Sequence, residues 1–174
     1  FQVLAGVDKD YTGTIKWGVT VTKANFPQDN TMYFKRPMNL IDWVRQYTGN
    51  EQAESFIRGW LGRMLFSGEE GLKMCNVLSG GERVRMMLIQ MMLSGANVLL
   101  MDDPTNHLDL ESITALNQGM TRFKGNILFT SHDQELMTTV ANRVIVIDKT
   151  IVYDKLGTYE DYLDEMESQG KGAV

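Results

Sequence analysis

Two adjacent carboxylates, Asp102 and Asp103, directly follow the apolar residues 98–101. Four apolar residues in a row fit a strand that is buried on both faces. Ligands of open parallel sheets bind outside the carboxyl ends of the strands, so the acids are expected where a metal-bound phosphate would bind. Mg²⁺ keeps much of its hydration shell, and Asp102 is therefore predicted to hold it through water. The alternative is a strand-end aspartate that only caps the next turn.

Two further segments carry groups that can bind a phosphate. Ser79, Gly80 and Gly81 open a strongly helical segment. Free backbone N–H groups at a helix N-terminus bind anions, and glycine permits their close approach. His132 follows a second apolar strand, and a neutral imidazole can donate a hydrogen bond to a phosphate oxygen. Taken singly, a Ser-Gly-Gly turn or a histidine after a strand is usually structural.

In this chain order, the three segments resemble the ATP-binding cassette (ABC) ATPases. The sequence Thr-Asn-His-Leu-Asp at 105–109 narrows the resemblance to the ABC-F class of soluble, translation-associated ATPases. The resemblance covers nearly the whole chain and implies ATP and Mg²⁺ as cofactors. ATP hydrolysis requires charge neutralisation on the γ-phosphate, an oriented water, and a group that accepts or steers its proton.

The resemblance also implies roles for particular residues. Asp103 takes the position of the catalytic carboxylate that polarises the attacking water, and His132 that of the switch histidine, which contacts the γ-phosphate. Gln28 matches the Q-loop glutamine, which reaches the metal and the γ-phosphate, so the expected metal contacts are Asp102 and Gln28. Asp109 matches the D-loop, and it equally makes a good N-cap for the helix that follows.

The resemblance further implies a partner. Ser79, Gly80, Gly81 and Glu82 correspond to the cassette signature, which binds ATP held on a different nucleotide-binding domain. Two cassettes thus enclose two nucleotides between them, and a second cassette is the expected partner. Glu82 replaces the more common signature glutamine, a substitution familiar among ABC-F relatives.

Asp103 departs from the family pattern, which usually has glutamate at this position. An aspartate offers the same carboxylate on a stem that is one methylene shorter, so it reaches about 1.5 Å less. We therefore expect weak but real hydrolysis by the intact protein.

No Walker A loop, a glycine-rich loop ending in Gly-Lys-Ser/Thr, occurs in the sequence. Residues 1–6 are typical of the last turns of a helix that Gly6 stops, and in the family that helix begins at Walker A. We expect the C-terminal portion of one nucleotide-binding domain, cut just after Walker A, with negligible ATP affinity on its own. The Tyr159 and Tyr162 ending resembles the tails of second cassettes and favours the second position of a tandem pair.

The order of strands and helices predicts an α/β fold with a mostly parallel sheet. It corresponds to a partial ABC-type nucleotide-binding domain with a helical subdomain and without the Walker A strand and loop. Strands are expected at 14–21, 98–101, 127–130, 143–147 and 150–153, and helices after Asn39, at 53–65, after Gly81, after Asp109, at 136–140 and at 159–163. The expected domain parts are a core start with the Q-loop (1–38), a helical subdomain ending in the signature helix (39–95), a core part (96–157), and a C-terminal helix and tail (158–174). The part 96–157 contains Walker B, which is the apolar strand that ends in Asp102, the D-loop and the switch histidine.

Composition narrows the function classes. The 174 residues are 43% hydrophobic and 22% charged, which suits one globular unit with a sizeable core. No uninterrupted apolar stretch of about 18 residues occurs, so no membrane span is expected. The net charge of −5 argues against a surface that binds nucleic acid as a whole, and contact with the ribosome or RNA is expected through regions absent from this sequence. The single Cys75 fits a reducing compartment, and a cytoplasmic location is expected.

Two other functions are alternatives at this point. A nucleotide-binding subunit of an ABC transporter would use the same chemistry, although Asn106 and His107 stand where importers and exporters usually have Ser-Ala. A catalytically silent interaction domain is the second alternative, motivated by the missing Walker A loop and the short Asp103. Co-sedimentation with ribosomes or with membranes separates the ATPase from the transporter subunit, and the codons upstream of Phe1 test the silent domain.

Overall fold

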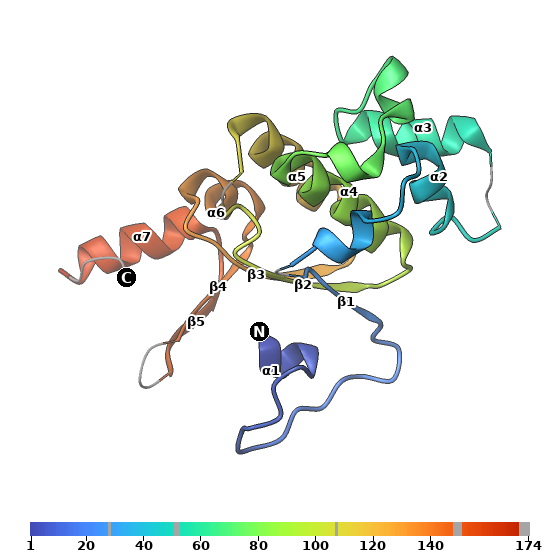
Figure 1. The fold of residues 1–174 in the computed structure, drawn as a ribbon. Helices are drawn as coiled ribbons and strands as arrows, with labels where there is room; N and C mark the ends of the chain where they lie inside the picture. Colours follow the sequence, from blue (N-terminus) through green and yellow to red (C-terminus); the bar gives the residue numbers. More distant parts are fainter. Residues whose placement is uncertain (28, 51–52, 107, 148–150, 171–174) are drawn as a thin grey trace. The chain divides into compact units, whose positions relative to one another are not determined.

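The computed structural model describes the chain apart from residues 28, 51–52, 107, 148–150 and 171–174. The chain divides into two compact units, Phe1–Thr130 and Ser131–Val174 (Figure 1).

A three-stranded parallel sheet forms the base of the first unit. Its strands are β1 (Lys23–Asn25), β2 (Val98–Asp102) and β3 (Asn126–Thr130), in the order β1-β2-β3. The central strand β2 is buried up to its last residue, as its apolar composition predicts. The register aligns Leu99 with Ala24 on one side and with Ile127 on the other. The carboxyl ends of the strands therefore meet at one edge of the sheet.

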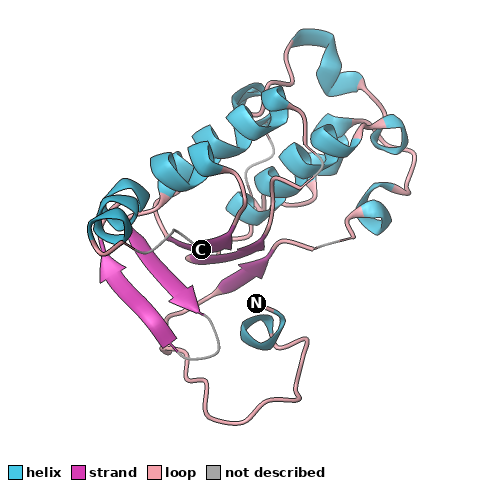
Figure 2. Ribbon diagram, turned by 90° about the vertical axis from the view of Figure 1, so that its left-hand side faces the viewer, coloured by secondary structure: helices cyan, strands magenta, loops and turns pink. Residues whose placement is uncertain are grey.

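Helices pack over this sheet and on one another (Figures 1 and 2). In chain order the first unit contains α1 (Gln2–Ala5), η1 (Thr31–Phe34), α2 (Leu40–Arg45), α3 (Glu54–Arg63), η2 (Gly68–Leu72), η3 (Cys75–Val77), α4 (Gly80–Leu93) and α5 (Leu110–Arg122), where η marks a 3₁₀ helix. Helix α4 contacts α2, α3 and α5, and Met86, Leu88 and Ile89 on it are fully buried. Burial of each such side chain contributes about 1.5–3 kcal/mol, so α4 is the centre of the core.

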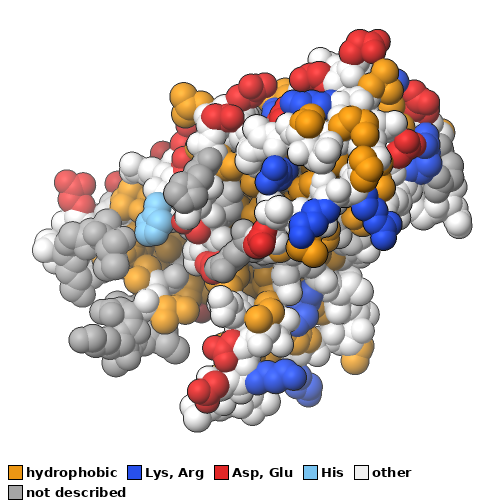
Figure 3. Space-filling view, in the orientation of Figure 1, with side chains coloured by type: hydrophobic (Ala, Val, Ile, Leu, Met, Phe, Trp, Pro, Cys, Tyr) orange, Lys and Arg blue, Asp and Glu red, His pale blue; other side chains and the backbone are white. Residues whose placement is uncertain are grey.

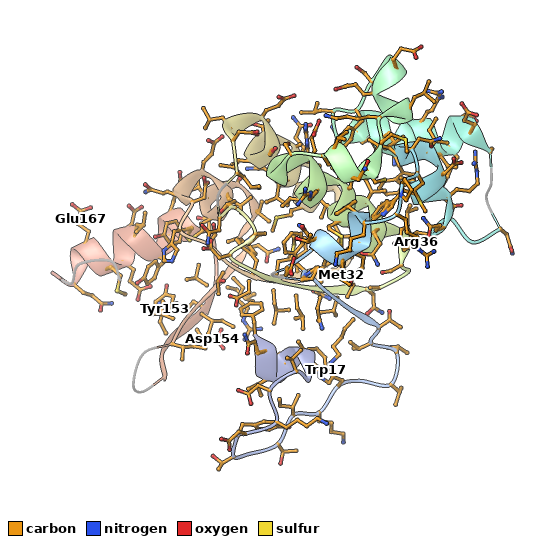
Figure 4. The ribbon with its side chains drawn as sticks, in the orientation of Figure 1. Trp17, Met32, Arg36, Tyr153, Asp154 and Glu167 are labelled. Atoms are coloured by element: carbon orange, nitrogen blue, oxygen red, sulfur yellow. The ribbon has the colours of Figure 1, made fainter. Side chains whose placement is uncertain are left out.

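Local sequence signals set several of these boundaries. Gly6 ends α1 in the left-handed conformation with φ of 81°. The Asn39 side chain accepts a hydrogen bond from the Asp42 N–H at 2.8 Å and caps α2, as predicted. Lys23 Nζ donates to the Leu4 carbonyl at 3.0 Å and lies 4.6 Å from the ring centre of Trp17. These contacts link β1 to α1 and to the loop that carries Trp17, which is labelled in Figure 4.

The prediction of strand structure at 14–21 is wrong. These described residues form no strand, and the first strand begins at Lys23. Val19 is fully exposed, and Gly13 has φ of 111°. β-branched residues favour a strand only where a neighbouring strand and a buried face are present, and most of this segment faces solvent.

The second unit consists of α6 (Gln134–Val140), the antiparallel hairpin β4 (Arg143–Ile147) and β5 (Ile151–Leu156), and α7 (Tyr159–Ser168). Tyr153 and Asp154 are neighbours on β5 (Figure 4). The Tyr153 ring lies 5.0 Å from that of Tyr162 on α7, and its hydroxyl donates to Glu165 at 3.0 Å. Arg143 donates two hydrogen bonds of 2.8 Å to Asp154 across the hairpin. With the parallel sheet of the first unit, these elements confirm the predicted α/β class.

Candidate functional site

Asp102 and Asp103 stand at the carboxyl end of β2, where the register places Thr130, the last residue of β3, beside Asp102. The Thr130 hydroxyl donates a hydrogen bond to Oδ1 of Asp102 at 2.7 Å. The same hydroxyl oxygen accepts a hydrogen bond from the backbone N–H of Asp103 at 3.0 Å. One threonine therefore contacts both predicted acids.

Asp103 has a left-handed backbone conformation with φ of 44°. Among residues other than glycine, aspartate and asparagine adopt this region most readily, because their short polar side chains can hydrogen-bond locally. The sharp turn takes the Asp103 N–H out of the strand ladder, and Thr130 satisfies it. Both acids are half-buried, which leaves them partly accessible to a ligand.

A cleft of about 450 Å³ lies beside the two acids. The residues that line it are Phe26, Asn30, Gly80, Arg83, Val84, Asp102, Asp103, Pro104, Asn106 and Leu108. The cleft thus combines two carboxylates with the N-terminus of α4 and an arginine. Helix N-termini and arginine favour phosphate, and carboxylates favour a divalent cation.

The acid pair fits a hydrated Mg²⁺. The Thr130 hydroxyl engages Oδ1 of Asp102, so Oδ2 could contact a metal-bound water. The described part of the chain holds no group of three or more His, Cys, Asp and Glu side chains that could bind a metal. Mg²⁺ is commonly held by one or two carboxylates, with waters and substrate phosphates as its other ligands, so Asp102 could hold it together with a nucleotide.

The start of α4 is stabilised by a capping box. The Ser79 hydroxyl accepts from the Glu82 N–H at 3.2 Å, and Glu82 Oε2 accepts from the Ser79 N–H at 2.8 Å. Lys73 Nζ donates to Glu82 Oε1 at 2.6 Å. Burial alone would raise the pKa of Glu82, but the hydrogen bonds from Lys73 and Ser79 outweigh it and hold the pKa below the ordinary 4.5. Glu82 is therefore ionised at neutral pH, with its charge paired.

The two signature glycines have different surroundings. A Cβ added to Gly81 would lie 2.2 Å from Ser112 Oγ and 3.3 Å from Asp109 Oδ2. A Cβ added to Gly80 would meet no atom within 4 Å. Gly81 is thus required by the packing of α4 against the start of α5, whereas Gly80 is exposed and lines the cleft.

Asp109 caps α5. Its Oδ1 accepts from the Ser112 N–H at 2.8 Å, and hydrogen bonding by Ser112 holds the pKa of this carboxyl below its usual value. The capping role expected from the sequence is confirmed. The role of Asp109 in a D-loop stays a prediction.

His132 belongs to the second unit, whereas the two acids belong to the first. The two residues that flank His132 in the sequence both make hydrogen bonds at the start of α6. Asp133 Oδ1 accepts from the Leu136 N–H at 2.7 Å, and Ser131 Oγ accepts from the Asp133 N–H at 3.0 Å. The predicted contact of His132 with a γ-phosphate stays a prediction.

Gln28, the predicted Q-loop glutamine, lies outside the described residues, as does His107. Phe26 and Asn30, which flank Gln28 in the sequence, both line the cleft.

The structure brings Asp102, Asp103 and Gly80 to one cleft, while Ser79, Gly81, Glu82 and Asp109 surround the adjoining starts of α4 and α5. The sequence interpretation missed three residues at this site: Thr130, Lys73 and Arg83. For Thr130 the sequence contained a signal, because a hydroxyl residue ends the strand that follows the strand of Asp102. The pairing of Lys73 with Glu82 had no such signal, because it depends on the path of the turn between them.

Comparison with known proteins identifies the family. The sequence matches the ABC transporter family over residues 1–106, more than half of the chain. The chain therefore belongs to this family and contains an ABC ATP-binding domain. Domains of this family are ATPases that bind ATP with Mg²⁺.

Curated relatives refine this assignment. The chain is 55% identical over 172 residues to the uncharacterized ABC transporter ATP-binding protein YkpA of Bacillus subtilis, covering 98% of this chain and 32% of YkpA. It is 32% identical over 171 residues to the energy-dependent translational throttle protein EttA of Haemophilus influenzae (93% and 30%). It is 31% identical over 169 residues to ABC transporter F family member 4 of Dictyostelium discoideum (97% and 15%). The chain spans about a third or less of these relatives, and the resemblance to ABC-F cassettes is confirmed.

Solved structures share the fold at 22% identity. One is the RNase-L inhibitor, with a TM-score of 0.72 over 97% of this chain and 34% of that chain. Another, with a TM-score of 0.73 and the same coverage, is the complex of the archaeal ribosomal stalk protein aP1 and the archaeal ribosome recycling factor aABCE1.

Among the described residues, no helix combines the length and apolar character needed to cross a bilayer.

Proposed function

We propose that this chain is most of one cassette of an ABC-F ATPase, which binds and hydrolyses ATP with Mg²⁺ between two cassettes. The observation that carries the proposal is the hydrogen-bonded group of Asp102, Asp103 and Thr130 at the carboxyl end of β2. Bound Mg²⁺ supplies charge neutralisation on the nucleotide phosphates.

The residues of this chain have separate roles in the proposed reaction. Asp102 holds the hydrated ion, and Asp103 orients the attacking water and takes up its proton. By the family resemblance, His132 would donate a hydrogen bond to a γ-phosphate oxygen, and Gln28 would contact the metal and the γ-phosphate. The short Asp103 makes turnover slow, because its carboxylate must act from about 1.5 Å further away than a glutamate would.

The signature residues serve a nucleotide held by a second cassette. The exposed N-terminus of α4 offers backbone N–H groups to an anion, and Gly80 leaves room for close approach. The pairing of Lys73 with Glu82 at 2.6 Å supports this role, because an unpaired carboxylate would repel a triphosphate. Asp109 reaches the opposing site from the D-loop.

We further propose that the whole protein acts on the ribosome in the cytoplasm. The support comes from relatives named a translational throttle protein and an F family member, and from a ribosome recycling factor of the same fold that is in complex with a ribosomal stalk protein. The net charge is −5, and positive and negative side chains are interspersed on the face shown in Figure 3. We therefore propose that other regions of the protein contact the ribosome.

Sedimentation of the full-length protein tests this function. Asp103→Asn removes the carboxylate that accepts the proton but keeps ATP binding, so with ATP this variant should sediment with ribosomes. The wild type should be released as ATP is consumed, and Asp10→Asn, a change at an exposed loop position, should behave like the wild type. Recovery with membrane vesicles instead would favour a transporter subunit, and a wild type without ATP turnover would favour a silent interaction domain.

A further inference from the structure

We propose that Thr130 is a positioning residue that sets the geometry of both acids; the inference rests on the proposed ATPase function of this site. A hydroxyl has one donor and two acceptor positions. Thr130 donates to Asp102 Oδ1 at 2.7 Å and accepts from the Asp103 N–H at 3.0 Å. Its single oxygen thus links the residue that holds the metal to the residue that orients the water.

For Asp102, the hydrogen bond fixes the plane of the carboxylate. The last side-chain torsion of aspartate is broad and nearly two-fold, so an unrestrained carboxylate presents either oxygen at many angles. The hydroxyl of Thr130 selects Oδ1, so that Oδ2 could contact a metal-bound water. Hydrogen bonds of this kind commonly account for 10–100-fold in metal affinity or activity.

For Asp103, the hydrogen bond fixes the backbone from which the short side chain starts. The residue has φ of 44°, a conformation that persists when neighbouring structure supports it. The bond from its N–H to Thr130 provides that support. A misplacement of about 1 Å at a reacting group can cost about 100-fold in rate, and the short stem of Asp103 leaves little freedom to correct one.

The backbone of Thr130 belongs to the parallel sheet. It ends β3, which pairs with β2 in parallel register from Val98 to Asp102. Its β-branched side chain has few allowed rotamers, so the position of the hydroxyl follows from the backbone of the sheet. The alignment of the two acids is thereby tied to the sheet and not to the loop that follows Asp103.

Three variants of the full-length protein test this role. Thr130→Val removes the hydroxyl and keeps the shape, and Thr130→Ser keeps the hydroxyl. Thr114→Val is the matched control, because its exposed hydroxyl only donates within α5 to the Leu110 carbonyl. The measurements are Mn²⁺ affinity by electron paramagnetic resonance with a non-hydrolysable ATP analogue, hydrogen exchange of the Asp103 amide, and the single-turnover rate of ATP hydrolysis.

We expect Thr130→Val to weaken Mn²⁺ binding 10–100-fold, to speed exchange of the Asp103 amide, and to slow the single turnover by a similar factor. Thr130→Ser should restore all three values to within a few-fold of the wild type. Thr114→Val should leave them unchanged, as should the affinity of every variant for the analogue in the presence of EDTA. A merely structural role of Thr130 would lower the melting temperature without this selective loss of metal affinity.

The outcomes separate this inference from the proposed function. If the wild type hydrolyses ATP and Thr130→Val binds Mn²⁺ as tightly as the wild type, the role of Thr130 is wrong and the function stands. If the wild type binds the Mn²⁺ complex without hydrolysis, the ATPase proposal fails, while the Val and Ser variants still decide the role of Thr130 from Mn²⁺ affinity and amide exchange. If the wild type binds no Mn²⁺ with the analogue, both are overturned.

Discussion

Asp103 combines a short side chain with a left-handed backbone. A glutamate at this position should raise the rate of hydrolysis but lower the stability of the fold. In Asp103→Glu the carboxylate reaches about 1.5 Å further, so the single-turnover rate should rise by about tenfold or more. Glutamate tolerates φ of 44° less well than aspartate, so the free energy of unfolding should fall by up to about 1 kcal/mol. Quenched-flow hydrolysis and urea denaturation measure the two effects.

Asp103→Asn is the control for this comparison. Asparagine keeps the tolerance for a left-handed backbone but cannot take up a proton, so stability should be retained and hydrolysis lost. An unchanged rate in Asp103→Glu would show that side-chain reach does not limit turnover.

Glu82 makes the stability of the fold depend on pH in the acid range. Its folded-state pKa lies below 4.5 because Lys73 and Ser79 stabilise the ionised form against burial. The resulting stability is present in full above the ordinary pKa and is lost as the pH falls through the folded-state value. Glu82→Gln should therefore flatten the dependence of the unfolding free energy on pH below about 4.5.

The cost of Glu82→Gln at pH 7 should stay below about 1 kcal/mol, because the amide oxygen can still accept from the Ser79 N–H and Lys73 is partly exposed. Urea denaturation over a series of pH values measures both effects, with the exposed Glu69→Gln as control. A pH profile that Glu82→Gln leaves as steep as that of the wild type would contradict the assignment.

At the scale of the element, the contact between the starts of α4 and α5 depends on Gly81. Gly81→Ala would bring a Cβ to 2.2 Å from Ser112 Oγ, so the two helices must separate, and we expect a loss of about 1–3 kcal/mol of stability. Gly80→Ala, where a Cβ meets nothing within 4 Å, should be neutral or slightly stabilising through its higher helix propensity. Chemical denaturation of the two variants compares the same change at adjacent positions.

Ser112 offers a second check on this packing. Ser112→Gly removes both side-chain atoms that a Cβ at Gly81 would approach, at 2.2 and 3.0 Å. Combined with Gly81→Ala, it should recover part of the lost stability. Equal stability of the two glycine variants would show that the helices do not meet this closely.

Most elements could be predicted from the sequence, because their signals are local. Asn39, Asp109 and Asp133 each cap the helix that follows, and the apolar run before Asp102 forms the buried central strand. Residues 14–21 have the composition of a strand, but nothing in the sequence shows that they lack a partner. Strand formation depends on a neighbouring strand and a buried face, and neither can be deduced from local composition.

The candidate site could likewise be predicted only where its signals are local. Asp102 and Asp103 were predicted, because residues at the end of an apolar strand can be found from sequence alone. The contact of Thr130 with both acids was not predicted, because it depends on the register of β3 against β2 across 28 positions of the chain. The distinction between Gly80 and Gly81 likewise depends on how closely α5 approaches α4.

At the scale of the whole molecule, the single cysteine gives a probe for the opening of the first unit. Cys75 is fully buried, and its N–H donates to the Met38 carbonyl at 2.9 Å. Burial raises the pKa of the thiol to about 11, so about one molecule in a thousand carries the reactive thiolate at pH 8. We expect the native protein to react with Ellman's reagent at least about 100-fold more slowly than the urea-unfolded protein.

The dependence of this reaction on urea distinguishes two ways of exposing the thiol. Cys75 lies between η2 and α4 in sequence and forms no part of the exposed cleft lining, so its exposure should require the core around α4 to open. The logarithm of the labelling rate should then rise with urea with the slope of equilibrium unfolding. A cysteine placed at exposed Thr114 in a Cys75→Ser background should react rapidly at every urea concentration. Rapid labelling of native Cys75, or a slope near zero, would show that local fluctuations expose this thiol while the core stays folded.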